Sequence, residues 1–288
     1  MHTTILGATS EPIPVIGFGG MPLSTQGRPS EEVGQRVLNA AIDAGMTLID
    51  TADVYCRDDG DIGHNERLIA SVLAARADRD SIRVATKAGM RRPRGSWTHD
   101  ASPAHIREAC EQSLRALQTE QIWLYQLHTP DPKVAFEKSV EAFAELKREG
   151  KIRHFGLSNV SIDQIEKASR ILPVVSVQNR LNPYFRESVK VAEECARREI
   201  TFLAYSPVGG GRLAKKLPQF DILLELARKH DRSVHAVVLA WVRAQGATVV
   251  PIPAARTVEH AVDSATAASL TLTPAEIEAM DETEFDRT

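Results

Sequence analysis

Cysteine is scarce in this chain, and its three cysteines lie far apart. Cys56, Cys110 and Cys195 form no CxxC pair and no Cys/His cluster with metal-ligand spacing. Because their number is odd and their separations are large, the sequence predicts neither a disulfide framework nor a zinc site. We therefore expect no metal cofactor, and a reducing compartment, the cytoplasm, as the location.

The chain also lacks long apolar runs and a strong charge of one sign. No stretch has the length and apolarity of a membrane span, and the first residues, MHTTILGATS, do not resemble a signal peptide. We therefore expect no membrane partner. The net charge of −3 gives no support for a nucleic-acid-binding surface. With 43% hydrophobic and 25% charged residues, the composition is that of an ordinary globular protein.

What the chain does contain is an alternation of short apolar runs with longer amphipathic segments. The runs are rich in Val, Ile and Leu, as expected for parallel strands covered on both faces. Helix signals lie between them: Ser102 precedes Pro103, segments 161–164 and 273–276 have capping-box patterns, and Gly150 marks a helix end. The apolar runs lie at residues 15–18, 46–49, 82–85, 122–127, 152–157, 174–177, 201–204 and 247–250.

Eight strands alternating with helices indicate a closed (β/α)8 barrel or an open doubly wound sheet. The open sheet calls for a GxGxxG turn, and Gly17-Phe18-Gly19-Gly20 lacks that spacing. A barrel takes about 250 residues, close to the 288 of this chain. We predict an α/β fold with a single (β/α)8 TIM barrel domain over residues 1–288. A β-hairpin within about the first ten residues should close its bottom.

Polar residues follow the predicted strands at the points where they end. Asp50 ends the second run, with Tyr55 five residues later, and Lys87 and His128 follow the third and fourth runs. Active sites of such barrels lie at the carboxyl ends of the strands, so we expect one shared pocket. Later strand ends add Ser158, Asn159, Gln178, Asn179, Tyr205 and Ser206.

Taken singly, each of these residues has an ordinary structural explanation as a turn residue, a surface charge or a packing residue. Together they make chemical sense. A phenol such as Tyr55 has a pKa of about 10, and a buried ammonium beside it should stabilise the phenolate and lower that value. Asp50 supplies the counter-charge for Lys87, and His128 orients a substrate oxygen. This set protonates an oxygen, and because no side chain delivers hydride, it requires a nicotinamide cofactor.

Seven segments of the chain carry a resemblance to a known family. They resemble the successive signature segments of the aldo-keto reductase superfamily, and the chain looks similar to its bacterial members, to pyridoxal reductases and to potassium-channel β subunits. The resemblance implies NADPH-dependent reduction of an aldehyde or ketone. It makes Asp50, Tyr55, Lys87 and His128 the catalytic tetrad, with Tyr55 as general acid. The segments are MTLIDTADVY (46–55), VATKAG (84–89), LYQLHTPDP (124–132), GLSNV (156–160), SVQNRLNP (176–183), AYSPVGGGRL (204–213) and VPIPAARTVEH (250–260).

The resemblance also implies how the nicotinamide is held. Ser158, Asn159 and Gln178 would bind its carboxamide, and the ring of Tyr205 would stack on it. We expect Gly20, Met21 and Asp50 to lie close to the same ring. Trp97, in the loop after the third strand, is a candidate substrate wall beside Tyr55 and His128, or equally a loop-packing residue.

The far end of the cofactor has its own candidates. Arg256 lies after the eighth strand near an expected helix N-terminus, where it could pair with a 2′-phosphate, which favours NADPH over NADH. His260 could contact adenine, although family members often have an amide at this position or at Ser264, and glycine at Ala254. In the loop after the seventh strand, glycines let backbone N–H groups approach phosphate, and its candidates are Ser206, Pro207, Val208, Gly209, Gly210 and Arg212.

Two other functions fit parts of this pattern. Lys87 could form the Schiff base of a barrel aldolase. The chain could also be a nicotinamide-binding accessory module like the potassium-channel β subunits. The intact tetrad favours a free-standing enzyme that acts on a small carbonyl compound. Cys56, next to Tyr55, is either a redox-sensitive thiol or an ordinary pocket residue.

Overall fold

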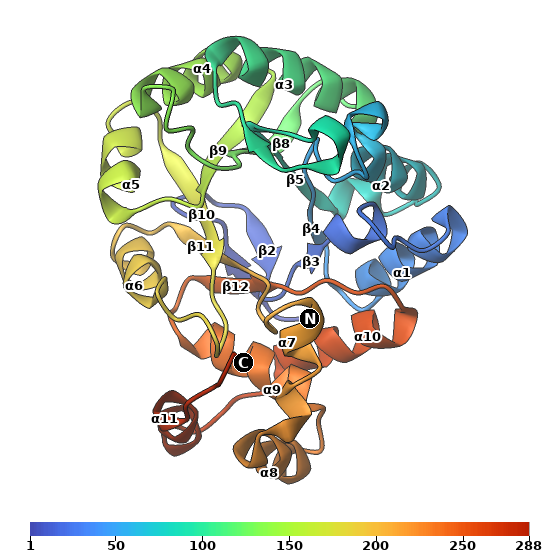
Figure 1. Cartoon of the computed structure of the whole chain (residues 1–288), viewed down its shortest axis with the longest axis vertical. Helices are drawn as coiled ribbons and strands as arrows, with labels where there is room; N and C mark the ends of the chain where they lie inside the picture. The colour runs from blue at the N-terminus through green and yellow to red at the C-terminus, as the bar shows by residue number, and fades with distance from the viewer. Residues whose placement is uncertain (288) are drawn as a thin grey trace.

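The computed structural model describes residues 1–287, and at its centre parallel strands form a barrel (Figure 1). Backbone hydrogen bonds from Gly17 to Pro251 (3.0 Å) and from Gly19 to Pro253 (2.8 Å) close the ring between the first and last strands. The predicted barrel is therefore confirmed. Its eight strands follow one another in chain order as β3 (Phe18–Gly19), β4 (Leu48–Asp50), β5 (Arg83–Ala88), β8 (Ile122–Leu127), β9 (Ile152–Ser158), β10 (Val174–Arg180), β11 (Thr201–Tyr205) and β12 (Val249–Ile252).

Helices surround the barrel, and they begin where the sequence signals predict. The side chain of Ser102 accepts a hydrogen bond from the backbone of His105, and capping boxes begin at Ser161 and Thr273. Gly150 has a φ of 77°, the left-handed conformation that ends many helices. The surrounding helices are α1 (Glu31–Asp43), α2 (His64–Ala74), α3 (Pro103–Leu117), α4 (Phe136–Arg148), α5 (Ile162–Ser169), α6 (Val189–Arg197), α9 (Val234–Ala244) and α10 (Val258–Thr266).

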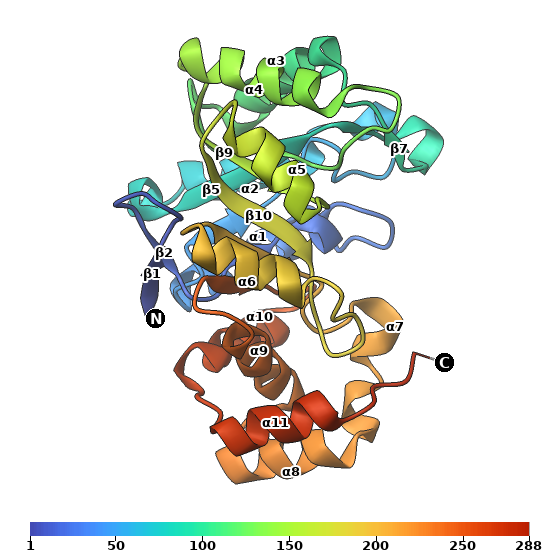
Figure 2. The ribbon, with the colours of Figure 1, turned by 90° about the vertical axis from the view of Figure 1, so that its left-hand side faces the viewer.

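Three further helices belong to the C-terminal part of the chain. Figure 2 shows α8 (Asp221–His230) and α11 (Pro274–Glu282) beside each other, below the barrel, with α7 (Gly211–Ala214) nearer to its mouth. Within residues 1–287, no helix combines the length and apolarity needed to cross a membrane.

The strands depart from the predicted apolar runs mainly at their ends. Of residues 15–18 only Phe18 belongs to β3; the backbone N–H of Val15 donates to the carbonyl of His2, whereas that of Gly17 donates to Pro251. Every strand of the barrel except β8 instead extends beyond its apolar run, furthest in β5, which reaches Ala88, and in β10, which reaches Arg180. These extensions carry polar side chains into the rigid part of the barrel.

An antiparallel hairpin of β1 (Thr3–Ile5) and β2 (Pro12–Pro14) covers the amino-terminal end of the barrel. Leu6 and Ile13 are buried there against inward-facing strand residues such as Leu124. Figure 2 shows this hairpin at one end of the barrel and β7 (Thr98–His99) toward the other. The expected bottom closure agrees with this, but the hairpin extends to Pro14 and not only through the first ten residues.

Glu11 ties this hairpin to the barrel. Its carboxylate accepts hydrogen bonds from Trp123 Nε1 at 2.6 Å and His154 Nε2 at 2.8 Å, and it pairs with Arg153 at 2.5 Å. We expect Glu11→Ala to lower the free energy of unfolding by about 1–3 kcal/mol, because polar groups of Trp123 and His154 lose their partners. Urea titration at pH 7 measures this change.

The contribution of Glu11 should depend on pH. Burial raises the pKa of its carboxyl, but the hydrogen bonds from Trp123 and His154, together with the charges of His154 and Arg153, hold the pKa below 4.5. A depressed folded pKa gives stability that is present above the unfolded value of about 4.3 and lost as the pH falls through the folded value. The difference between wild type and Glu11→Ala should therefore shrink below about pH 4. A difference that stays constant down to pH 3 would contradict the ionic part of this argument.

Candidate active site

The four predicted tetrad residues lie together at the carboxyl end of the barrel. The Lys87 ammonium, on β5, donates to both carboxylate oxygens of Asp50 at 2.8 and 2.7 Å and to the Tyr55 hydroxyl at 3.1 Å. It also donates to the backbone carbonyl of Thr51 at 2.8 Å. The rings of Tyr55 and His128 are 5.8 Å apart. All four tetrad residues are at most 8% exposed, so their charges interact with little screening by water.

Burial dominates the protonation of this cluster. It lowers the pKa of the Lys87 ammonium, an effect that the Asp50 carboxylate opposes. It raises the pKa of the Tyr55 hydroxyl well above 10, and the charge of Asp50 adds to the rise. The expectation that Lys87 brings the Tyr55 pKa below its ordinary value is therefore wrong for this structure. Removing a phenolate from water is costly and the Asp50 carboxylate repels it, so Tyr55 keeps its proton near neutral pH.

His128 is held as a neutral ring. Burial lowers the pKa of its imidazole well below 6.5, and the positive charge of Lys87 lowers it further. Its Nδ1 is buried and has no hydrogen-bond partner among residues 1–287. A proton on Nδ1 would therefore lack an acceptor, which favours the tautomer with the proton on Nε2. Such a ring donates a hydrogen bond without adding positive charge.

Side-chain contacts continue from the tetrad around the mouth of the barrel. Gln178 donates through Nε2 to Asp50 at 2.7 Å. Asn159 donates to the carbonyl of His128 at 3.0 Å and accepts from the Tyr205 hydroxyl at 2.9 Å. Its φ of 57° is a conformation that Asn tolerates better than most residues. The structure thus brings the predicted carboxamide and stacking residues beside the tetrad, at or just after the ends of β9, β10 and β11: Ser158, Asn159, Gln178 and Tyr205.

Trp97 forms the outer part of the mouth. Its ring meets those of Tyr55 and His128 edge to face, at centroid distances of 6.5 and 6.4 Å. It is 44% exposed, so it stands between these two rings and solvent. The backbone N–H of Gly20 donates to the backbone carbonyl of Asp50 at 2.8 Å, and the neighbouring Met21 is 40% exposed. Gly20 and Met21 thus also lie at the mouth.

The loop after β11 presents nearly bare backbone. Ser206, Gly209, Gly210 and Gly211 have positive φ values of 48°, 86°, 66° and 38°. A Cβ at Gly209 would come within 2.9 Å of Leu213, whereas one at Gly211 would meet nothing within 4 Å. Pro207 and Val208 lie between these positions. Backbone N–H groups in such a loop suit a diphosphate, as the sequence predicts.

Two arginines of the predicted cofactor site contact other parts of the protein. Arg256 lies two residues before α10 and donates to the carbonyls of Pro22 at 3.3 Å and Gln26 at 3.1 Å. Arg212 donates to the carbonyl of Arg287 at 2.7 Å. These carbonyls take up only some of the five N–H donors of each guanidinium. His260 lies exposed in the first turn of α10.

Comparison with known proteins places this geometry in a family. The model of the Aldo/keto reductase family matches residues 15–284. The chain belongs to this family. An uncharacterized oxidoreductase of Schizosaccharomyces pombe, C215.11c, is 33% identical over 272 residues, which cover 93% of this chain and 85% of that protein.

Solved structures of aldo/keto reductases share the whole fold with this chain. The glycerol dehydrogenase AKR11B4 from Gluconobacter oxydans superposes with a TM-score of 0.86 at 27% identity, covering 99% of this chain and 98% of that one. An aldo-keto reductase from Klebsiella pneumoniae, solved in complex with NADPH, has a TM-score of 0.81 at 27% identity and covers 100% of both chains.

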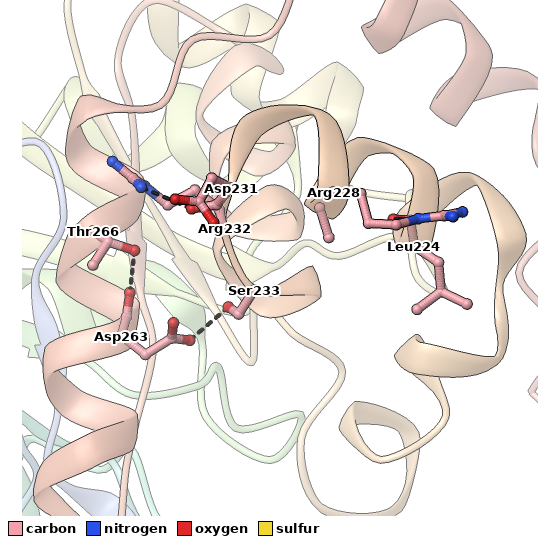
Figure 3. Close-up of a pocket in the computed structure, with 8 residues that line it drawn as sticks. Leu224, Arg228, Asp231, Arg232, Ser233, Asp263 and Thr266 are labelled. Carbon is pink, nitrogen blue, oxygen red and sulfur yellow. Dashed lines mark hydrogen bonds between the residues drawn. The ribbon is translucent and has the colours of Figure 1, made fainter.

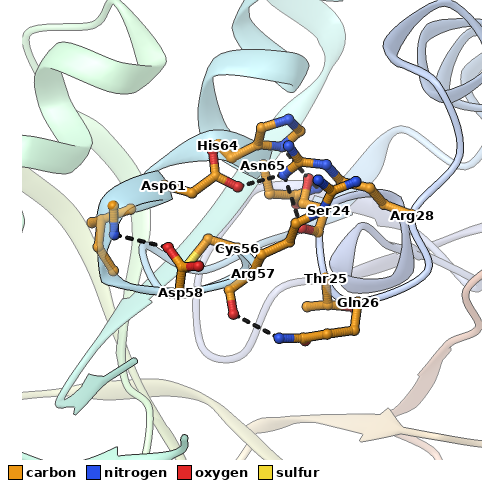
Figure 4. Close-up of polar contacts among 12 residues, drawn as sticks. Ser24, Thr25, Gln26, Arg28, Cys56, Arg57, Asp58, Asp61, His64 and Asn65 are labelled. Atoms are coloured by element: carbon orange, nitrogen blue, oxygen red, sulfur yellow. Dashed lines mark hydrogen bonds and ion pairs between the residues drawn. The ribbon is translucent and has the colours of Figure 1, made fainter. Parts of the chain in front are cut away.

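This aldo/keto reductase supports its barrel mouth with a residue that sequence reasoning missed. Asn65, fully buried in α2, donates to the carbonyl of Gly20 at 2.9 Å and to Ser24 Oγ at 2.7 Å. A Cβ at Gly20 would come within 2.4 Å of Asn65 Oδ1, so this position requires glycine. Figure 4 shows Ser24 between Asn65 and His64, whose Nδ1 lies 2.8 Å from it. Polar residues at a helix start usually serve as caps, so the sequence did not distinguish Asn65.

Cys56 is an ordinary buried thiol in this reductase. Its Sγ donates to the carbonyl of Val54 at 3.3 Å. Burial raises the pKa of the thiol to about 11. Because the thiolate is the reactive form, these surroundings favour the pocket-residue interpretation over a redox-sensitive one.

A hollow of about 670 Å³ lies apart from the barrel mouth, between α8, the start of α9 and α10 (Figure 3). Its polar lining serves helix ends: Ser233 Oγ accepts from the backbone of Ala236 and donates to Asp263 at 2.7 Å. Thr266 donates to the carbonyl of Asp263 at 2.6 Å. These helix-end contacts account for the polar groups without a ligand.

Proposed function

We propose that this chain, acting as a single barrel domain over residues 1–288, reduces an aldehyde or ketone to an alcohol with NADPH. The observation that carries the proposal is the contact of 3.1 Å between the buried Tyr55 hydroxyl and the Lys87 ammonium, which is paired with Asp50. Membership of the Aldo/keto reductase family and the NADPH-bound Klebsiella relative support it. The three buried, unpaired cysteines fit the cytoplasm as the compartment.

In this proposal the side chains of the tetrad handle the proton. NADPH, when bound, would supply the hydride for the carbonyl carbon of the substrate. Tyr55 transfers its hydroxyl proton to the carbonyl oxygen as the charge develops there, acting as general acid. Lys87 stabilises the phenolate that this transfer leaves, and Asp50 balances the ammonium. The Nε2–H of His128 donates a hydrogen bond to the same oxygen and orients it toward Tyr55.

The residues around the mouth fit the parts of NADPH. The amide and hydroxyl side chains of Ser158, Asn159 and Gln178 suit the carboxamide of the nicotinamide. The exposed backbone after β11 suits the diphosphate, and the guanidinium of Arg256, before α10, suits the 2′-phosphate. Tyr55, Trp97 and His128 are then the substrate contacts. We assign the cofactor to Gly20, Met21, Asp50, Ser158, Asn159, Gln178, Tyr205, Ser206, Pro207, Val208, Gly209, Gly210, Arg212, Arg256 and His260.

The contacts of Lys87 weigh against a Schiff-base aldolase. Its ammonium has four acceptors within 3.1 Å, contributed by Asp50, Thr51 and Tyr55. A protonated Schiff base on Lys87 would keep only one N–H, so most of these acceptors would be left buried without a donor, which is costly. The same complete tetrad favours turnover over a purely sensing, accessory role.

Arg256→Ala tests the cofactor preference. We expect wild type to turn over a panel of aldehydes and ketones faster with NADPH than with NADH. The variant should bind NADPH about ten- to a hundredfold more weakly, because each lost charge-assisted hydrogen bond is worth about 1.5–3 kcal/mol. NADH binding should stay within about twofold, since that cofactor lacks the 2′-phosphate. Fluorescence titration with each cofactor gives both dissociation constants.

The two cofactors serve as controls for each other. Arg256 also holds the carbonyls of Pro22 and Gln26, so a loosened loop would weaken NADPH and NADH alike. An equal loss for both would refute the phosphate contact. Arg256→Lys keeps the charge without the bidentate geometry and should give an intermediate NADPH affinity.

A further inference from the structure

The guanidinium of Arg92 is buried at the rim of the barrel mouth without a carboxylate partner among residues 1–287, and Arg92 is 1% exposed. Its Nη2 donates to Gln26 Oε1 at 2.9 Å and to the carbonyls of Cys56 at 3.2 Å and Arg57 at 3.1 Å. Its Nε and Nη1 are buried without a hydrogen-bond partner in the described structure. A buried cation with so few partners is costly, so ordinary packing does not explain it.

The face of this guanidinium lies against Trp97. The Arg92 Cζ is 4.0 Å from the centroid of the indole ring, within the range of a cation–π contact. Trp97 belongs to the turn between β6 (Met90–Arg91) and β7, and its other contacts at the mouth are the edge-to-face ones with Tyr55 and His128.

Arg92 therefore joins three separate loops at the mouth. Gln26 comes from the loop after β3, Cys56 and Arg57 from the loop after β4, and Trp97 from the β6–β7 turn. Figure 4 shows that Gln26 also donates directly to the Arg57 carbonyl, at 2.6 Å. The turn approaches these loops closely, since a Cβ at Gly95 would lie 3.1 Å from both Gln26 Nε2 and the Arg57 carbonyl.

We propose that Arg92 is a positioning residue that fixes Trp97 as a wall of the substrate site and thereby favours carbonyl compounds with a flat, aromatic group. This inference rests on the proposed carbonyl reduction. The planar guanidinium matters because it stacks on the indole while one edge donates to three acceptors. A lysine ammonium keeps the charge but has no plane to stack. Direct binding of an anionic substrate group by Arg92 is the competing outcome, and it would require the covered Nε and Nη1 to become accessible.

The test compares Arg92→Lys with wild type on benzaldehyde and 4-carboxybenzaldehyde, with NADPH as reductant. We expect KM for both aldehydes to rise about five- to tenfold, the range of a lost cation–π contact, with kcat and NADPH affinity within about twofold. Arg94→Lys is the matched control, because Arg94 lies in the same turn but contacts Asp59 only through its backbone N–H. It should leave both KM values unchanged.

Repeating the substitution in a Trp97→Ala variant distinguishes positioning of Trp97 by Arg92 from direct binding of the substrate by Arg92. In Trp97→Ala, adding Arg92→Lys should change KM no further than about twofold, because the residue on which Arg92 acts is gone. An equal effect of Arg92→Lys with and without Trp97 would overturn the proposal. A KM increase confined to 4-carboxybenzaldehyde would overturn it too, in favour of direct anion binding.

Fluorescence tests the same contact without turnover. Acrylamide quenching of Trp97, after subtraction of a Trp97→Phe blank, should become at least twofold stronger in Arg92→Lys and in Arg92→Met. Unchanged quenching in folded variants would refute the positioning role even if the protein reduced neither aldehyde. Conversely, stronger quenching together with absent wild-type turnover would reject the proposed function and leave the contact established. Thermal unfolding by circular dichroism identifies variants that have not folded.

Discussion

Tyr55→Phe is expected to lower kcat for carbonyl reduction by about a thousandfold while leaving NADPH affinity within about twofold. The substitution removes one oxygen atom, the one that lies 3.1 Å from the Lys87 ammonium. Without it the carbonyl oxygen receives its proton only from water or from His128, whose neutral ring is a poor acid. The ring of Tyr55 itself is kept, so packing against Trp97 and His128 is retained.

Tyr125→Phe provides a matched control for this experiment. Tyr125 is also fully buried, but its hydroxyl has no hydrogen-bond partner within residues 1–287, and its ring packs on Phe143, outside the tetrad. Removing that hydroxyl should leave kcat unchanged and stability equal or slightly higher, because no hydrogen bond is lost. Steady-state kinetics and nicotinamide fluorescence measure both variants. Near-wild-type reduction by Tyr55→Phe would refute the acid role.

The tetrad was predictable from sequence because it depends on the simplest property of the barrel. Strands that run parallel in chain order bring their carboxyl ends to one mouth, so Asp50, Lys87 and His128 must converge once the strands are recognised. Capping signals at Ser102 and Ser161 were equally local, and both helices begin there. These are features that a few neighbouring residues determine.

The features that the sequence analysis missed depend on how distant loops pack against one another, and local sequence patterns do not encode this packing. Asn65 lies 45 residues after Gly20, in a helix that begins at His64, and no sequence motif joins the two positions. Arg92 acts where three loops meet. The shift of the Tyr55 pKa, but not its role as a proton donor, was predicted in the wrong direction for a similar reason. The sequence indicated that Tyr55 lies near Lys87. It did not indicate how deeply the Tyr55 hydroxyl is buried, and burial is the main cause of its raised pKa.

Lys87→Met is the second large effect, with kcat expected to fall by about a thousandfold, because the phenolate loses the ammonium that stabilises it. Residual activity should also respond differently to pH. Without the positive charge, burial and the Asp50 carboxylate raise the pKa of Tyr55 further, so alcohol oxidation, which needs the phenolate as base, should begin at higher pH than in wild type. Oxidation rates measured from pH 6 to 11 give this shift. An unchanged profile would contradict the coupling of Lys87 to Tyr55.

Stability separates the chemical role of Lys87 from its structural one. Lys87 and Asp50 form a buried ion pair, with side chains 0% and 4% exposed. Removing one charge leaves the other buried without a partner. Lys87→Met alone should therefore lose about 3 kcal/mol or more of unfolding free energy. The double variant Asp50→Asn/Lys87→Met removes both charges and should recover much of that loss in urea titration. Its kcat should stay as low as that of Lys87→Met, because the phenolate still lacks its ammonium. If kcat recovered together with stability, Lys87 would serve only to hold the fold, and the proton chemistry assigned to it would have to be abandoned.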